Sequence, residues 1–174
     1  MSPAMIFSTH LVLGYIPWLF WFSAYFWPKL RTMDRVEAQR AIALLHSFRF
    51  FGLVFIVPGV VGAALPKEFA EFAAYGDFAT GILAILALLT IRLPIVFWPL
   101  VVGYNLVGMV DILVDYYHGA RFALPSLSGQ LGAAYVIPII YVPLLMLTHF
   151  AAVYLLLRRG HKNDRILTSG AVPS

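Results

Sequence analysis

Five long apolar runs constrain the fold of this chain more than any motif in it. They cover residues 5–27, 41–65, 72–91, 93–117 and 131–157. A helix needs about 20 mostly apolar residues to cross the hydrocarbon core of a bilayer. Only 11% of the 174 residues are charged, against about 25% in an ordinary soluble domain, so the chain cannot cover itself with polar surface. The sequence therefore predicts an all-α membrane bundle of five transmembrane helices, formed by a single domain at residues 1–157.

The polar segments between the runs predict how the bundle meets the membrane surface. Residues 28–40 are polar and charged, and Leu30, Met33 and Val36 recur within them at roughly helical spacing. We expect this segment to be amphipathic and to lie at the interface. Residues 158–174 are also polar, and we expect them to form a short cytoplasmic tail.

The distribution of basic residues predicts the orientation. Nine of the twelve Lys and Arg residues lie on one side of the five predicted spans, and two, Lys67 and Arg121, lie on the other; the last, Arg49, falls inside a span. Cytoplasmic loops carry the excess of basic residues, so the N-terminus is expected outside and the C-terminus in the cytoplasm, as in a bacterial inner (plasma) membrane. The run 72–91 is the weakest, and the sequence leaves open whether it spans fully.

Composition also excludes several classes of protein. The chain has no cysteine, which rules out thiolate-held iron–sulfur clusters and zinc sites. No lysine lies within a span, so a retinal Schiff base is excluded. The basic residues line the ends of apolar runs rather than forming a patch for nucleic acid. The expected partners are therefore the lipid bilayer and either other membrane subunits or further copies of the chain.

Ionisable residues inside a span are costly and usually face the bundle interior. Asp111, Asp115 and His118 share one helical stripe near the predicted outer face, because they are spaced i, i+4, i+7. His10 on the first span has a similar predicted depth. Two carboxylates and two imidazoles at one depth suggest a divalent metal site or a proton pathway. The alternative is that these residues lie at the water-exposed end of a helix and have no functional role.

Three further polar residues accompany this outer group. Tyr104 continues the stripe inward, Asn105 lies beside it, and Asp77 is expected to start the third span on the same side.

A second polar group is predicted near the inner face. It contains His46 and Arg49, which share a face of the second span at i, i+3 spacing, and His149 on the fifth span. No carboxylate is expected near Arg49 at that depth. Its partners are then backbone carbonyls, water, an anionic lipid or a bound anion, unless it reaches toward the cytoplasm.

The four histidines suggest a redox cofactor. Two imidazoles at one depth on facing helices can ligate the iron of a b-type haem. The candidate pairs are His46 with His149 and His10 with His118, with Arg49 as a partner for a propionate.

Three hypotheses of different kinds follow, and the sequence leaves open whether the protein is an enzyme. The leading one is a haem-binding redox or electron-transfer membrane protein. The second is a small proton- or metal-coupled transporter that uses Asp111, Asp115 and His10. The third is an accessory subunit of a membrane complex with no chemistry of its own.

Overall fold

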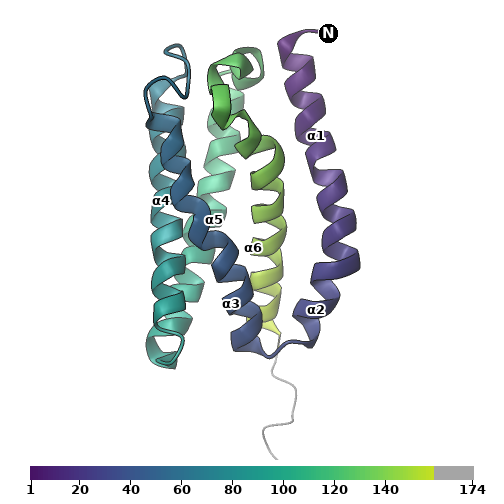
Figure 1. Ribbon diagram of the computed structural model, residues 1–174, viewed down its shortest axis with the longest axis vertical. Coiled ribbons are helices and arrows are strands. Elements are labelled where there is room, and N and C mark those ends of the chain that lie inside the picture. The colour runs from purple at the N-terminus through teal and green to yellow at the C-terminus, as the bar shows by residue number, and fades with distance from the viewer. Residues whose placement is uncertain (159–174) are drawn as a thin grey trace, which may run out of the picture.

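The computed structural model describes residues 1–158, and its regular elements are all helical (Figure 1). They are α1 (Pro3–Trp21), η1 (Phe22–Phe26), α2 (Trp27–Thr32), α3 (Arg35–His46), η2 (Ser47–Ile56), α4 (Lys67–Leu89), α5 (Pro94–Arg121), η3 (Leu124–Tyr135), η4 (Ile137–Tyr141) and α6 (Val142–Leu157). Five continuous helical stretches are long and apolar enough to cross a membrane: Pro3–Thr32, Arg35–Ile56, Lys67–Leu89, Pro94–Arg121 and Ile137–Leu157. The predictions of an all-helical fold and of five such helices are confirmed.

The turn between the first two long helices falls inside the predicted interfacial segment 28–40. The structure divides this segment between α2 and α3, with a break at Met33. Met33 has an extended backbone, and the Asp34 side chain caps α3 by accepting from the backbone N–H of Val36 at 2.6 Å. An aspartate cap satisfies a helix N-terminus, so the chain reverses here within two residues.

The second long helix ends earlier than the apolar run 41–65 suggested. Val57 has an extended backbone and Gly59 a positive φ of 83°, which a glycine adopts without strain. The connection that follows is held to η3, because Gln130 O accepts from Gly62 N at 2.7 Å and Gln130 Oε1 accepts from Ala64 N at 3.2 Å. Hydropathy alone does not separate such an apolar loop from a helix.

The third long helix begins at Lys67, five residues before the predicted span. Asp77 therefore lies near the middle of α4, not at its start. Small residues on α4 allow close packing against η2: a Cβ on Gly81 would lie 2.7 Å from the backbone nitrogen of Phe50. This close packing sets the position of the buried polar residues described below.

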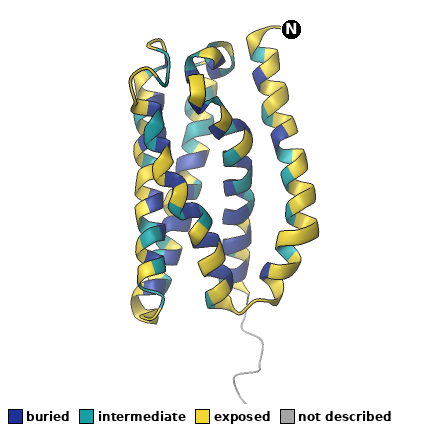
Figure 2. Ribbon diagram, in the orientation of Figure 1, coloured by how far each residue is buried: buried dark blue, intermediate teal, exposed yellow. Residues whose placement is uncertain are grey.

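The first helix lies at the edge of the bundle, where Figures 1 and 2 show it as a largely exposed element. Only Phe7 and Gly14 of α1 are buried. Gly14 packs directly on the backbone carbonyl of Ile139, and the indole nitrogen of Trp18 donates to Ile140 O at 2.7 Å. The first helix is therefore held mainly by the last span and the segment that precedes it.

Candidate functional site

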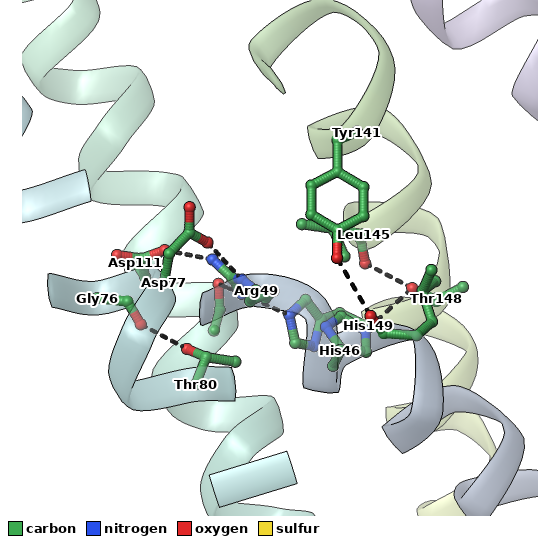
Figure 3. Close-up of polar contacts among 12 residues, drawn as sticks. His46, Arg49, Gly76, Asp77, Thr80, Asp111, Tyr141, Leu145, Thr148 and His149 are labelled. Carbon is green, nitrogen blue, oxygen red and sulfur yellow. Dashed lines mark hydrogen bonds and ion pairs between the residues drawn. The ribbon is translucent and has the colours of Figure 1, made fainter. Parts of the chain in front are cut away.

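A buried arginine lies at the centre of the bundle (Figure 3). Arg49 of η2 is 1% exposed. Its Nε donates to Asp77 Oδ1 of α4 at 2.6 Å, and its Nη2 donates to Asp111 of α5. Nη1 lies 3.3 Å from both the carbonyl oxygen of Gly108 and Nε2 of His149 on α6. Four of the five long helices thus contribute a partner or the arginine itself.

The helix type of η2 explains why Arg49 faces inward. A 3₁₀-helix has three residues per turn, so side chains at i and i+3 lie directly above one another. Over the ten residues of η2, Arg49, Gly52 and Phe55 form one buried edge, and His46, the last residue of α3, precedes them at the same spacing. Long 3₁₀ stretches are uncommon, and this one keeps His46 and Arg49 on a common face as their i, i+3 spacing predicts.

Glycines on three helices make room for this cluster. They are Gly52 of η2, Gly76 of α4 and Gly108 of α5. A Cβ on Gly52 would overlap Asp77, and one on Gly76 would overlap the Asp111 carboxylate. A Cβ on Gly108 would lie 2.5 Å from His149 Nε2 and closer still to Arg49. The backbones approach to a distance that only glycine permits.

Hydrogen bonds fix the protonation of His149. Asn105 Nδ2 donates to Val101 O at 2.8 Å, so its Oδ1 faces His149 Nδ1, 2.9 Å away. Because an amide oxygen only accepts, Nδ1 carries the ring proton. Nε2 is then the acceptor for Arg49 Nη1, 3.3 Å away.

His46 is also oriented by a hydrogen bond, in this case to Thr148 of α6. The hydroxyl of Thr148 donates to a backbone carbonyl of α6, that of Leu145 at 2.9 Å, and accepts from His46 Nε2 at 3.1 Å. His46 Nδ1 is buried without a hydrogen-bond partner. The buried Tyr104 ring lies 5.5 Å from the His46 ring, and its hydroxyl also has no partner. His46 therefore has one unprotonated, unpartnered nitrogen in the bundle interior.

The carboxylates outnumber the guanidinium. Asp115 lies one turn beyond Asp111 on α5, and both side chains have a buried Oδ1 without a hydrogen-bond partner. Asp115, Arg49 and Asp77 line the same cavity of about 210 Å³. Three carboxylates thus surround one cation, and two of the three have an unpartnered oxygen.

This arrangement corrects two expectations from the sequence. Arg49 was expected to have no carboxylate nearby, and Asp77 was expected near the outer end of its helix. The depth of Asp77 was wrong because α4 begins at Lys67 and includes the polar residues before the apolar run. The outer carboxylates and the inner arginine and histidines form one cluster rather than two.

The two outer histidines have neighbours of their own. His10 Nδ1 shares a 3.0 Å hydrogen bond with the Tyr135 hydroxyl, and the His118 ring packs on Phe72 with centroids 5.2 Å apart. Within residues 1–158, no group of three or more His, Asp or Glu side chains could hold a metal ion. Asp111 and Asp115 lie together, but the described part of the chain does not bring His10 and His118 to them as one set of metal ligands.

The inner histidines are brought together, but not with a gap between them. The His46 and His149 rings are in direct contact, with centroids 4.0 Å apart and planes at 38°. An iron atom held by both would need a ring nitrogen on each of its two sides. Both nitrogens of His149 and Nε2 of His46 already have partners. The haem hypothesis stays a prediction, and this arrangement does not favour it.

A family comparison covers almost the whole helical part of the chain. Residues 6–157 match a family described as a domain of unknown function (DUF8737). The chain belongs to this family. Comparisons with curated proteins and with solved structures found no match. The Arg49 cluster, which consists of His46, Arg49, Asp77, Asp111, Asp115 and His149, is therefore the basis of the function proposed below.

Proposed function

We propose that this protein is a small proton-coupled transporter of a bacterial inner membrane, with the Arg49 cluster as its proton-binding site. Five long apolar helices and many exposed apolar side chains suit a lipid environment. Figure 1 shows α2, the start of α3, the α4–α5 connection and the end of α6 at one end of the bundle, and the start of α4 and the end of α5 at the other. The first set of segments contains Lys29, Arg31, Arg35, Arg40, Arg92 and Arg158, and the second contains Lys67 and Arg121, which supports an N-terminus outside.

The observation that carries the proposal is the excess of carboxylates near one buried guanidinium: Asp77 and Asp111 are buried, and Asp115 is partly buried. One guanidinium offsets the charge of one carboxylate, which leaves two of Asp77, Asp111 and Asp115 without a counter-charge. A charged side chain at the centre of a bilayer costs at least about 2.5–3.5 kcal/mol. The cluster becomes neutral when its unpaired carboxylates bind protons or another cation. A carboxylate that binds a proton for this reason is a proton-binding site.

The histidines extend this site across the bundle. Asp115 lies one turn beyond Asp111 toward the η3 end of α5, whereas His46 lies one 3₁₀ turn from Arg49 toward the opposite end. His149 lies between His46 and Arg49 and presents an unprotonated Nε2. An imidazole can accept and pass on a proton, and His46 Nδ1 has no hydrogen-bond partner. The order Asp115, Asp111, Arg49, His149, His46 is a row of polar side chains, and a proton that moves along it must bypass the Arg49 guanidinium, which keeps its own protons.

A flux measurement tests the transport part of the proposal. The purified protein is reconstituted in liposomes that contain a pH-sensitive dye, and a potassium gradient with valinomycin drives proton entry. Without a second substrate this assay measures uncoupled proton movement through the site. We expect faster acidification than in protein-free liposomes, and Asp111→Asn should abolish the increase. Glu71→Gln is the matched control, because Glu71 lies on α4 in an exposed ion pair with Lys67 and should leave the rate unchanged.

Infrared spectroscopy tests proton binding without requiring flux. A titration of the protein in lipid should show a protonated-carboxyl band that persists at neutral pH and is lost in Asp115→Asn but kept in Glu71→Gln. The absence of both the flux and this band would refute the proposal.

A further inference from the structure

The cavity beside Arg49 has walls of two kinds. Most of its lining is apolar and comes from every long helix; Phe7 of α1, Phe55 of η2, Phe69 of α4 and Ile137 of η4 are examples. Its volume is about 210 Å³. An apolar cavity of roughly 150 Å³ holds a benzene molecule, so this one has room for a benzene-sized body with a short substituent.

The polar groups of the lining lie on η2, α4 and α5. They are Arg49, Asp77, Asp115 and Tyr116. Arg49 and Asp77 bind each other, and the Tyr116 hydroxyl shares a 2.6 Å hydrogen bond with Tyr15 of α1. Asp115 is different, because its buried Oδ1 has no hydrogen-bond partner. Asp115 therefore offers an unpartnered carboxylate beside the cavity, and this carboxylate is negatively charged when ionised.

A ligand that complements both the apolar and the polar part of the lining has an apolar body and one cationic group that donates hydrogen bonds. A carboxylate in such a site is stabilised most by a charged hydrogen-bond donor in direct contact. An ammonium group is such a donor, and it has no acceptor atom that would need a partner in an apolar cavity. The aromatic rings of Phe7, Phe55 and Phe69 suit an aromatic or aliphatic body of this size. A neutral alcohol of the same shape would donate only an uncharged, weaker hydrogen bond to Asp115, and an anion would place two negative charges together.

We propose that the cavity binds a small lipophilic amine whose ammonium group takes the place of the proton on Asp115. This inference depends on the proposed function, since it makes proton and amine alternative occupants of one carboxylate. Binding of the ammonium releases one proton from Asp115, so the charge of the cluster does not change. Such an exchange couples movement of the amine in one direction to movement of a proton in the other.

Calorimetric titration of the full chain in lipid nanodiscs tests the inference, with benzylamine as the probe and empty nanodiscs to subtract partition into lipid. Benzyl alcohol and benzoate serve as neutral and anionic molecules of similar shape. We expect saturable binding of benzylamine alone. Asp115→Asn should weaken it by about tenfold or more, because a charged hydrogen bond is lost. Glu68→Gln should bind as the unaltered protein does, since Glu68 is exposed outside the cavity.

A second variant tests the location independently of Asp115. Leu11 of α1 lines the cavity, so Leu11→Trp should fill the space and abolish benzylamine binding. Saturable binding of benzoate would overturn the inference and indicate an anion site at Arg49. Binding of none of the three probes, or benzylamine binding that survives both Asp115→Asn and Leu11→Trp, would also overturn it.

The same preparations separate this inference from the proposed function. Proton flux without amine binding would refute the inference of an amine ligand and leave the proposed proton-binding site standing. Amine binding that depends on Asp115, without flux and without the carboxyl band, would instead refute proton-coupled transport.

Discussion

Replacing Gly108 by alanine tests whether the close approach of α5 to Arg49 holds the cluster together. The new methyl group would lie 2.5 Å from His149 Nε2 and 2.7 Å from its Cε1, and closer still to Arg49 Nη1. Neither the Arg49 nor the His149 side chain can move away without losing a hydrogen bond. Asp77 and Asp111 hold the guanidinium, and Asn105 holds the imidazole.

Gly103 provides a matched control on the same helix. A Cβ there meets nothing within 4 Å, so Gly103→Ala should raise the free energy of unfolding by about 0.5–1 kcal/mol through helix propensity. Gly108→Ala receives the same gain, which therefore cancels in the comparison. What remains is overpacking, about 1–3 kcal/mol, and the weakened hydrogen bond from a charged donor, about 1.5–3 kcal/mol.

We therefore expect Gly108→Ala to be about 2.5–6 kcal/mol less stable than Gly103→Ala. In a chain of this size the difference corresponds to a Tm gap on the order of 10 °C. Thermal unfolding in detergent, followed by circular dichroism, measures it. Equal Tm values for the two variants would show that the cluster does not need this close approach and would refute the reasoning.

Three further substitutions examine other contacts of the cluster, each by the same unfolding measurement. Arg49→Met should lower the free energy of unfolding by about 3–5 kcal/mol, because buried carboxylates lose their cation; a loss below about 1 kcal/mol would contradict the ion pairs. Thr148→Val should cost about 1–3 kcal/mol, since His46 Nε2 loses its acceptor, and an unchanged Tm would argue against the assigned ring proton. Asp115→Asn should raise stability by on the order of 1 kcal/mol, as expected where a functional site is kept at the expense of stability; a marked loss would mean that Asp115 has a structural partner.

The five helices could be predicted because apolar length is a local property of the sequence. The boundaries could not, since the loop after Ile56 is as apolar as a helix and α4 extends five polar-rich residues beyond its apolar run. This second error displaced Asp77 in predicted depth and left Arg49 without a carboxylate. Arg49 and His149 were both predicted near the inner face, and the structure places them in contact.

Which helices lie next to each other could not be predicted from the sequence. Whether Asp111 faces Arg49 depends on which helices are neighbours, and no single-chain periodicity contains that information. One local signal was available: His46, Arg49, Gly52 and Phe55 recur at a spacing of three. This spacing fits a 3₁₀ face better than an α-helical one, and it includes one of the three glycines that make room for the cluster.

The edge position of α1 has a consequence for the order in which the molecule is assembled. Residues 3–21 are synthesised before their partners, because the contacts described for α1 are with Tyr116, Tyr135, Ile139 and Ile140, a hundred residues or more later in the chain. At about 5–20 residues per second, synthesis of the intervening chain takes on the order of 10 s. Throughout that interval α1 has none of these partners, and the cavity that Phe7 and Leu11 line cannot close.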